Sequence, residues 1–81
     1  MKFYYITFRS VTYAQRGERA LQAAGIHCTL LRTPKWMEEK GCGYSLSVKE
    51  GMGAVMLLRK HQIPFRKIYL QKNGQTEEVE L

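Results

Sequence analysis

A cysteine between two glycines is the feature of this sequence best suited to covalent chemistry. Cys42 lies between Gly41 and Gly43, just before a stretch in which apolar and small polar residues alternate. Glycine neighbours allow backbone dihedrals that other residues disfavour and let the backbone approach another group closely. Because the thiolate of cysteine is a strong nucleophile, a thiol held in the open at the start of a strand is the first candidate for a reactive group.

The residues after the cysteine predict the strand that would hold it. Residues 44–48, Tyr-Ser-Leu-Ser-Val, alternate with the period of two that is typical of a strand buried on one face. We expect a core face made of Tyr44, Leu46 and Val48, and a solvent face made of Ser45 and Ser47.

Before that strand, the sequence predicts a strand and a helix. Residues 3–8, Phe-Tyr-Tyr-Ile-Thr-Phe, are mostly aromatic and β-branched and indicate a central strand. Ser10 and Thr12 offer oxygen acceptors to the free amides of a helix start, and Gly25 ends that helix after Ala24. The strand could bury either Tyr4, Ile6 and Phe8 or Phe3, Tyr5 and Thr7, and we expect the first set because it is more apolar toward its end. The helix is expected to bury Ala14, Gly17, Leu21 and Ala24.

A second short strand, residues 27–31, leads into a polar connection over residues 32–40. The connection is too long for a tight hairpin and is therefore expected to have a role of its own. Its Trp36 and Met37 are predicted to dock a partner, although Trp36 would equally suit a position covering the core edge.

The second half of the chain predicts a helix over residues 49–61 and a strand over residues 65–70. Asn73-Gly74 is a strong hairpin signal, so residues 75–81 are expected to pair back as a short extra strand. The apolar stripe of the helix is predicted to consist of Met52, Val55, Met56 and Leu58.

The resulting order, βαββαβ with a terminal hairpin, predicts an α+β fold of the ferredoxin-like type in one domain spanning residues 1–81. Two helices would cover one face of an antiparallel sheet. With the usual strand order, the first and third strands lie side by side, which brings Cys42 next to Phe8, Arg9 and Ser10.

That position would favour an anionic sulfur. The free amides and positive dipole end of the first helix would point toward the thiol and lower its pKa below that of a free cysteine. His61, at the end of the second helix, is a candidate proton donor or acceptor. The supporting groups are predicted to be Arg9, Ser10, Thr12, Gly41, Gly43 and His61, with further positive charge from Lys35 and Lys40.

Other kinds of site find little support. Cys28 lies among apolar residues and is expected to be buried and inert. No pair of soft ligands has a zinc-type spacing such as C-x-x-C, so no metal is predicted. The chain contains no Asp, and nothing in it resembles a catalytic triad.

The charge is clearly basic, with thirteen Lys and Arg against seven acids and a net charge of +6. This favours a negative partner such as nucleic acid, an acidic protein or a small anion, unless it serves only solubility. Two cysteines do not make a disulfide framework, and the apolar start of the chain is too short for a signal peptide or a membrane span. We therefore expect a cytoplasmic protein with reduced thiols and no contact with a membrane.

Several stretches together resemble a family of small bacterial domains described as selenium or sulfur carrier proteins. They are FRSVTYAQRGERALQAAGI, the Pro34 connection and GCGYSLSV. The resemblance implies a carrier rather than an enzyme, with no cofactor and with Cys42 as the carrier thiol. It also implies a donor of the cysteine desulfurase or selenocysteine lyase type and an acceptor that stays unidentified. The supporting positions that it implies are Phe8, Ser10, Ala14, Glu18, Leu21 and Gly25.

Two readings without covalent chemistry remain open. A ferredoxin-like sheet with basic charge could bind RNA, but Ser45 and Ser47 occupy positions where such modules carry aromatic residues. Alternatively the domain could self-associate, because an exposed aromatic patch usually binds a partner. The predicted face of such a homo-oligomer consists of Phe3, Tyr5 and Tyr69.

Overall fold

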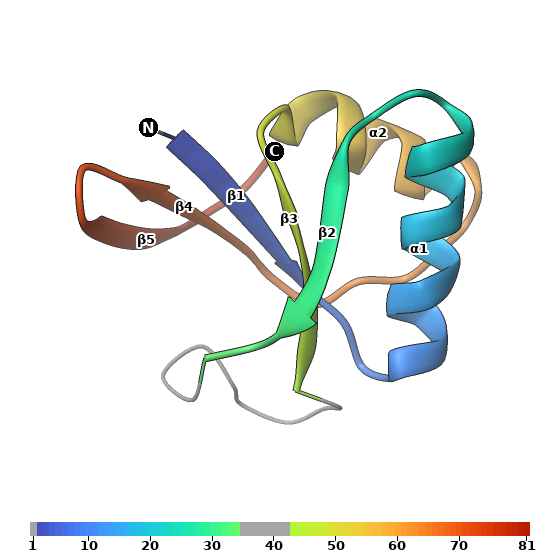
Figure 1. The fold of residues 1–81 in the computed structure, drawn as a ribbon, viewed down its shortest axis with the longest axis horizontal. Coiled ribbons are helices and arrows are strands. Elements are labelled where there is room, and N and C mark those ends of the chain that lie inside the picture. The colour runs from blue at the N-terminus through green and yellow to red at the C-terminus, as the bar shows by residue number, and fades with distance from the viewer. Residues whose placement is uncertain (1, 35–42) are drawn as a thin grey trace.

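A computed structural model describes residues 2–34 and 43–81 of the chain. It is an α+β structure in which two helices pack on one face of a five-stranded antiparallel sheet, as predicted (Figure 1). No helix within the described ranges is long and apolar enough to cross a membrane. The elements in chain order are β1 (Lys2–Thr7), α1 (Val11–Ala23), β2 (Cys28–Arg32), β3 (Tyr44–Val48), α2 (Gly51–Lys60), β4 (Ile68–Lys72) and β5 (Gln75–Val79).

The sheet has the order β2-β3-β1-β4-β5, with every neighbouring pair antiparallel. The prediction that the first and third strands lie side by side is therefore confirmed, and the uncharged middle of β1 is central. Thr7 at the end of β1 pairs with Ser45 near the start of β3. The fifth strand, β5, extends the sheet beyond β4.

Helix α1 begins and ends where its capping residues predict. The Ser10 side chain accepts a hydrogen bond from the Tyr13 amide at 3.3 Å, which closes the N-terminus. At the other end Gly25 is left-handed, with φ of 79°, and the Ile26 amide donates to the Leu21 carbonyl at 2.9 Å, as in a Schellman motif. Ala24 is exposed rather than part of the inner face, because the helix ends before it and the chain has already begun to turn.

The core lies between the helices and the sheet. Strand β1 buries the predicted face, with Ile6 and Phe8 almost fully enclosed and Tyr4 packed against them. Gly17 allows α1 to approach closely, since a Cβ added there would lie 3.1 Å from side-chain carbons of Leu46 and Leu58. The fully buried large side chains include Phe8, Ile6, Leu21, Leu46, Leu58, Val48 and Val55.

The apolar stripe of α2 was predicted wrongly at two positions. Met52 and Met56 are 57% and 62% exposed, whereas the buried residues are Gly51, Ala54, Val55 and Leu58. Small residues face the sheet because the helix lies close to it: a Cβ added to Gly51 would come within 2.8 Å of the Tyr4 ring. A stripe chosen for the largest apolar side chains therefore selects the wrong side of this helix.

The C-terminal hairpin confirms the turn prediction. Asn73 and Gly74 both have positive φ, 51° and 79°, which is the geometry of a two-residue type I′ turn. Strand β4 begins later than expected, at Ile68. The segment before β4 is still tied to β1, because the Arg66 amide donates to the Thr7 carbonyl at 2.7 Å.

Candidate functional site

Cys42, the predicted reactive residue, lies outside the described residues. The same holds for Gly41, predicted to support the thiol, and for Trp36 and Met37, predicted to dock a partner. Lys35 and Lys40 also lie outside them. The described chain resumes at Gly43, which one peptide bond joins to Cys42, so their Cα atoms are about 3.8 Å apart. The surroundings of Gly43 are therefore the described part of the candidate site.

Gly43 is buried and held against β2. The Thr33 amide donates to the Gly43 carbonyl at 2.6 Å, one residue pair beyond Arg32 and Tyr44, which end the β2–β3 ladder. Gly43 has φ of 75°, a left-handed conformation that glycine adopts far more readily than other residues. The prediction of an unusual backbone beside the cysteine is thus confirmed on its Gly43 side.

The end of β1 lies on the other side of β3. Thr7, the last residue of β1, pairs with Ser45 near the start of β3, so Arg9 follows β1 at the same end of the sheet at which Gly43 precedes β3. Ser10 follows as the N-cap of α1, so the helix begins at the same end of the sheet as β3 does (Figure 1). The first amides of a helix have no partner within the helix and carry partial positive charge, so this end of the fold favours an anion.

The charged residues that flank Gly43 on the neighbouring strands are cationic. Arg9 is exposed beyond the end of β1. Arg32, the last residue of β2, places its guanidinium carbon 5.4 Å from the centre of the Tyr44 ring. Neither the segment 28–34 nor the segment 43–48 contains an acidic residue. The described strand segments beside Gly43 therefore carry positive charge and no negative charge.

Two buried hydroxyl groups lie beside Gly43, and the sequence did not indicate either. Ser45 is completely buried and Thr33 is 5% exposed, and neither hydroxyl has a hydrogen-bond partner among the described residues. The expectation that Ser45 faces solvent is wrong, because the residue is completely buried. Thr7 on the same face differs, since its hydroxyl accepts from the Lys67 amide at 3.0 Å.

Thr12 and His61, two of the predicted supporting residues, are both exposed. His61 caps the C-terminus of α2. The last turn of that helix packs through Leu58 against Gly17, near the middle of α1 rather than at its first turn. A role for His61 beside the thiol stays a prediction.

Cys28 is buried, as predicted. Its Sγ lies 3.8 Å from the Glu18 carbonyl oxygen on α1. Burial, and to a lesser degree the negative charge of Glu18, raises the pKa of the thiol above its ordinary value. Such a thiol stays protonated at neutral pH and is a poor nucleophile.

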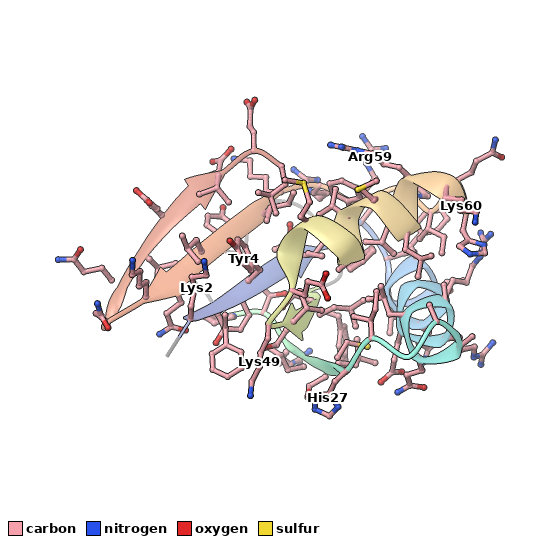
Figure 2. The ribbon with its side chains drawn as sticks, turned by 90° about the horizontal axis from the view of Figure 1, so that it is seen from above. Lys2, Tyr4, His27, Lys49, Arg59 and Lys60 are labelled. Atoms are coloured by element: carbon pink, nitrogen blue, oxygen red, sulfur yellow. The ribbon has the colours of Figure 1, made fainter. Side chains whose placement is uncertain are left out.

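The proposed aromatic face is less open than expected. Tyr5 and Tyr69 are paired across β1 and β4, but Tyr69 exposes only 9% of its surface. Tyr5 donates from its hydroxyl to the Gln71 side chain at 2.8 Å, and the Lys49 ammonium lies 5.8 Å from the centre of the Phe3 ring. Figure 2 labels Lys49, which directly follows β3. Binding of a second copy through this face stays a prediction.

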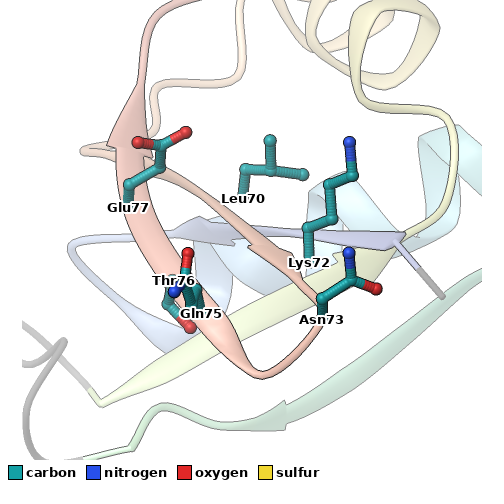
Figure 3. A pocket seen from close by; sticks show the side chains of 6 residues that line it. All are labelled: Leu70, Lys72, Asn73, Gln75, Thr76 and Glu77. Carbon is teal, nitrogen blue, oxygen red and sulfur yellow. The ribbon is translucent and has the colours of Figure 1, made fainter.

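A pocket of about 610 Å³ lies elsewhere, over the β4–β5 hairpin (Figure 3). Lys72, one of its lining residues, pairs with Lys2 at the start of β1. Gly43 lies at the opposite end of β1, where Thr7 pairs with Ser45. The length of β1 therefore separates the pocket from the candidate site. Its lining residues are Leu70, Lys72, Asn73, Gln75, Thr76 and Glu77.

Within residues 2–34 and 43–81, no three His, Cys, Asp or Glu side chains are grouped so that they could hold a metal ion. No curated protein and no solved structure matches the chain. The model of one protein family, described as "Putative Se/S carrier protein-like", matches residues 3–70 of the 81-residue chain. The match covers β1 to β3, both helices and most of β4, so the chain belongs to this family of Se/S carrier-like proteins.

Proposed function

We propose that this protein carries sulfur or selenium as a persulfide or perselenide on Cys42. The observation that supports the proposal most directly is the family match. It spans residues 3–70, which include Cys42, Gly43 and the strands and helix start at that end of the sheet. The described geometry agrees with the chemistry: a left-handed glycine precedes β3, and a capped helix start and two arginines lie at the same end of the sheet.

In the loading step, the Cys42 thiolate attacks the outer sulfur of a persulfide on a donor enzyme. One S–S bond forms on Cys42, the S–S bond of the donor breaks, and the donor cysteine leaves as a thiolate. A nucleophile on the acceptor later attacks the same outer atom, and the Cys42 thiolate is released. No oxidant or reductant is consumed, because the transferred sulfur keeps its oxidation state throughout.

Both forms of the carrier are anions, so the protein must stabilise negative charge. The unpaired amides of the first turn of α1, beginning at Val11, are suited to this. Arg9 and Arg32 add positive charge at the same end of the sheet. Such a carrier works without a cofactor.

The partners follow from the chemistry. The donor is of the cysteine desulfurase or selenocysteine lyase type, and the protein acts in the cytoplasm, where thiols stay reduced. Trp36 and Met37 form part of the surface that docks these partners. The carrier is built on a ferredoxin-like βαββαβ unit, to which β5 adds one edge strand.

The test is a loading reaction with a cysteine desulfurase and cysteine, followed by intact-mass measurement under non-reducing conditions. We expect one added sulfur on the native protein and on Cys28→Ala, and none on Cys42→Ala. Loading that persists in Cys42→Ala would move the role to Cys28. An unloaded native protein would overturn the proposal.

A further inference from the structure

We propose that the outer edge of β5 binds an extended segment of a partner protein, rich in Lys or Arg, as an additional antiparallel strand. Strand β5 is the last strand in the sheet order β2-β3-β1-β4-β5, so β4 is its one neighbour in the described chain. A strand with one neighbour leaves half of its backbone donors and acceptors available to another chain. This surface is independent of the chemistry of Cys42.

The hairpin register decides which backbone groups of β5 face outward. In a two-residue hairpin, the residues that flank the loop exchange backbone hydrogen bonds, and such pairs then alternate along the ladder. Lys72 and Gln75 flank the loop, so Gln75 and every second residue after it direct their N–H and C=O groups toward β4. Thr76 and Glu78 lie between these residues and direct theirs away from the sheet. Their backbone groups are therefore placed to pair with a further strand.

The β5 edge lacks most of the features that block strand addition in other proteins. Those features include proline, lysine, a β-bulge and a covering helix. Segment 75–79, QTEEV, contains neither Pro nor Lys, and its ladder with β4 runs without an inserted residue. Figure 1 shows the β4–β5 hairpin extending away from both α1 and α2. Its one protective feature is charge.

The glutamates of this edge determine which strand it accepts. Three of the seven acidic residues of the chain, Glu77, Glu78 and Glu80, lie in segment 75–81, which contains no Lys or Arg. Antiparallel pairing with the β5 of a second copy over all five residues would place Glu77 opposite Glu77. Like charges directly opposite each other destabilise a strand pair, whereas opposite charges stabilise it. The edge therefore disfavours its own copy and favours a basic segment.

The two faces of the hairpin offer different contacts to such a segment. On one face, Glu78 forms a partly exposed ion pair with Lys67, with 3.5 Å between nitrogen and oxygen. On the other face, Glu77 is opposite Leu70, and both line the pocket over the hairpin (Figure 3). Every second side chain of an added strand lies on this face, so a Lys or Arg there is next to Glu77 at the rim of the pocket. Backbone hydrogen bonds would supply affinity, and the pocket and Glu77 would supply side-chain preference.

The positive net charge of the whole chain does not oppose this binding strongly. Charges in solution are screened over about 8 Å at physiological ionic strength. A segment at the β5 edge therefore interacts mainly with the glutamates beside it.

The test is an NMR titration of the full chain with two synthetic peptides. One is a seven-residue peptide in which lysine and valine alternate, and the other has glutamate in place of lysine. We expect the lysine peptide to shift the backbone amides of Thr76 and Glu78 and to bind about tenfold more tightly than the glutamate peptide. Its affinity should fall as salt is added. Equal affinities of the two peptides, or shifts confined to other elements, would overturn the proposal.

Two substitutions at Thr76 separate the role of its backbone from that of its side chain. Thr76→Pro removes an outward N–H that the β4–β5 ladder does not use, and proline is tolerated at such positions of edge strands. Thr76→Ala keeps the N–H. We expect the lysine peptide to bind about tenfold more weakly to Thr76→Pro and as well as to wild type in Thr76→Ala. Wild-type affinity in Thr76→Pro would contradict strand addition.

A methylated peptide keeps the test decisive if thermal unfolding shows that Thr76→Pro does not fold. Methyl groups on alternate backbone nitrogens of the lysine peptide, on the edge that would meet β5, should abolish its binding to wild type. Undiminished binding of this peptide would overturn the proposal.

Hydrogen exchange of the protein alone tests the remaining occupant, a second copy of this chain. The amides of Thr76 and Glu78 should exchange rapidly at every protein concentration. Protection that rises with concentration would assign the edge to a second copy and overturn the proposal. None of these readouts depends on the loading of Cys42, so their outcome leaves the proposed function untouched.

Discussion

The backbone amide of Thr33 donates to the carbonyl oxygen of Gly43 at 2.6 Å, one residue pair beyond the last pair of the β2–β3 ladder. This hydrogen bond holds a left-handed glycine just before the start of β3, next to Cys42, which carries the proposed cargo. The position of Gly43 therefore depends on β2 as well as on its own strand.

Gly43→Ala should lower both stability and loading. The substitution forces a Cβ into a left-handed conformation, with an expected cost of about 1–2 kcal/mol. Gly25→Ala is a matched control, because its φ is 79° and no atom lies within 4 Å of the added Cβ. Chemical denaturation should show similar losses for both variants, while the loading reaction should be impaired only in Gly43→Ala. Equal loading of the two variants would show that the backbone at Gly43 has no part in the transfer.

Ser10→Ala should destabilise the protein by about 1 kcal/mol through the loss of the N-cap. The reason is the hydrogen bond from the Tyr13 amide to the Ser10 hydroxyl oxygen. Thr12→Ala removes an exposed hydroxyl two residues later and should change the free energy of unfolding by no more than about 0.5 kcal/mol. Urea unfolding separates these outcomes. If the start of α1 supports the anionic sulfur, loading falls in Ser10→Ala as well.

Cys28→Ala should change the pH dependence of stability. Burial and Glu18 raise the pKa of the Cys28 thiol from its ordinary value of 9.0, so the folded protein holds this proton to higher pH than the unfolded chain does. The resulting contribution to stability is complete below pH 9.0 and is lost as the pH rises through the folded pKa. Urea unfolding at about pH 8 and about pH 10 should therefore show a steeper loss in wild type than in Cys28→Ala. Parallel losses would contradict the assignment.

Gly51→Ala and Gly53→Ala should have opposite effects, although both replace a glycine in the first turn of α2. At Gly51 the new Cβ meets the Tyr4 ring at 2.6 Å, and overpacking of this kind costs about 1–3 kcal/mol. At Gly53 it meets only the end of the flexible Glu50 side chain, so the better helix propensity of alanine should stabilise the protein by up to about 1 kcal/mol. Melting temperatures that move in the same direction would refute this account of the helix contact.

Local chemistry in the sequence determined much of the fold. The more apolar of the two possible phases identified the buried face of β1, and Ser10 and Gly25 marked the two ends of α1. Asn73-Gly74 predicted the hairpin between β4 and β5. Each of these features depends on residues within a few positions of one another, which is why the sequence alone was sufficient to predict them.

The tertiary structure decided which surfaces are covered. Ser45 is on the face that alternation predicted, yet it is buried, because burial depends on what packs over that face. The inner side of α2 was decided by its close approach to Tyr4, which selects Gly51 and Ala54 over the larger Met52 and Met56. Similarly, only the pairing of β2 with β3 brings Thr33 beside Gly43, since contacts between residues distant in sequence leave no periodic signal in either segment.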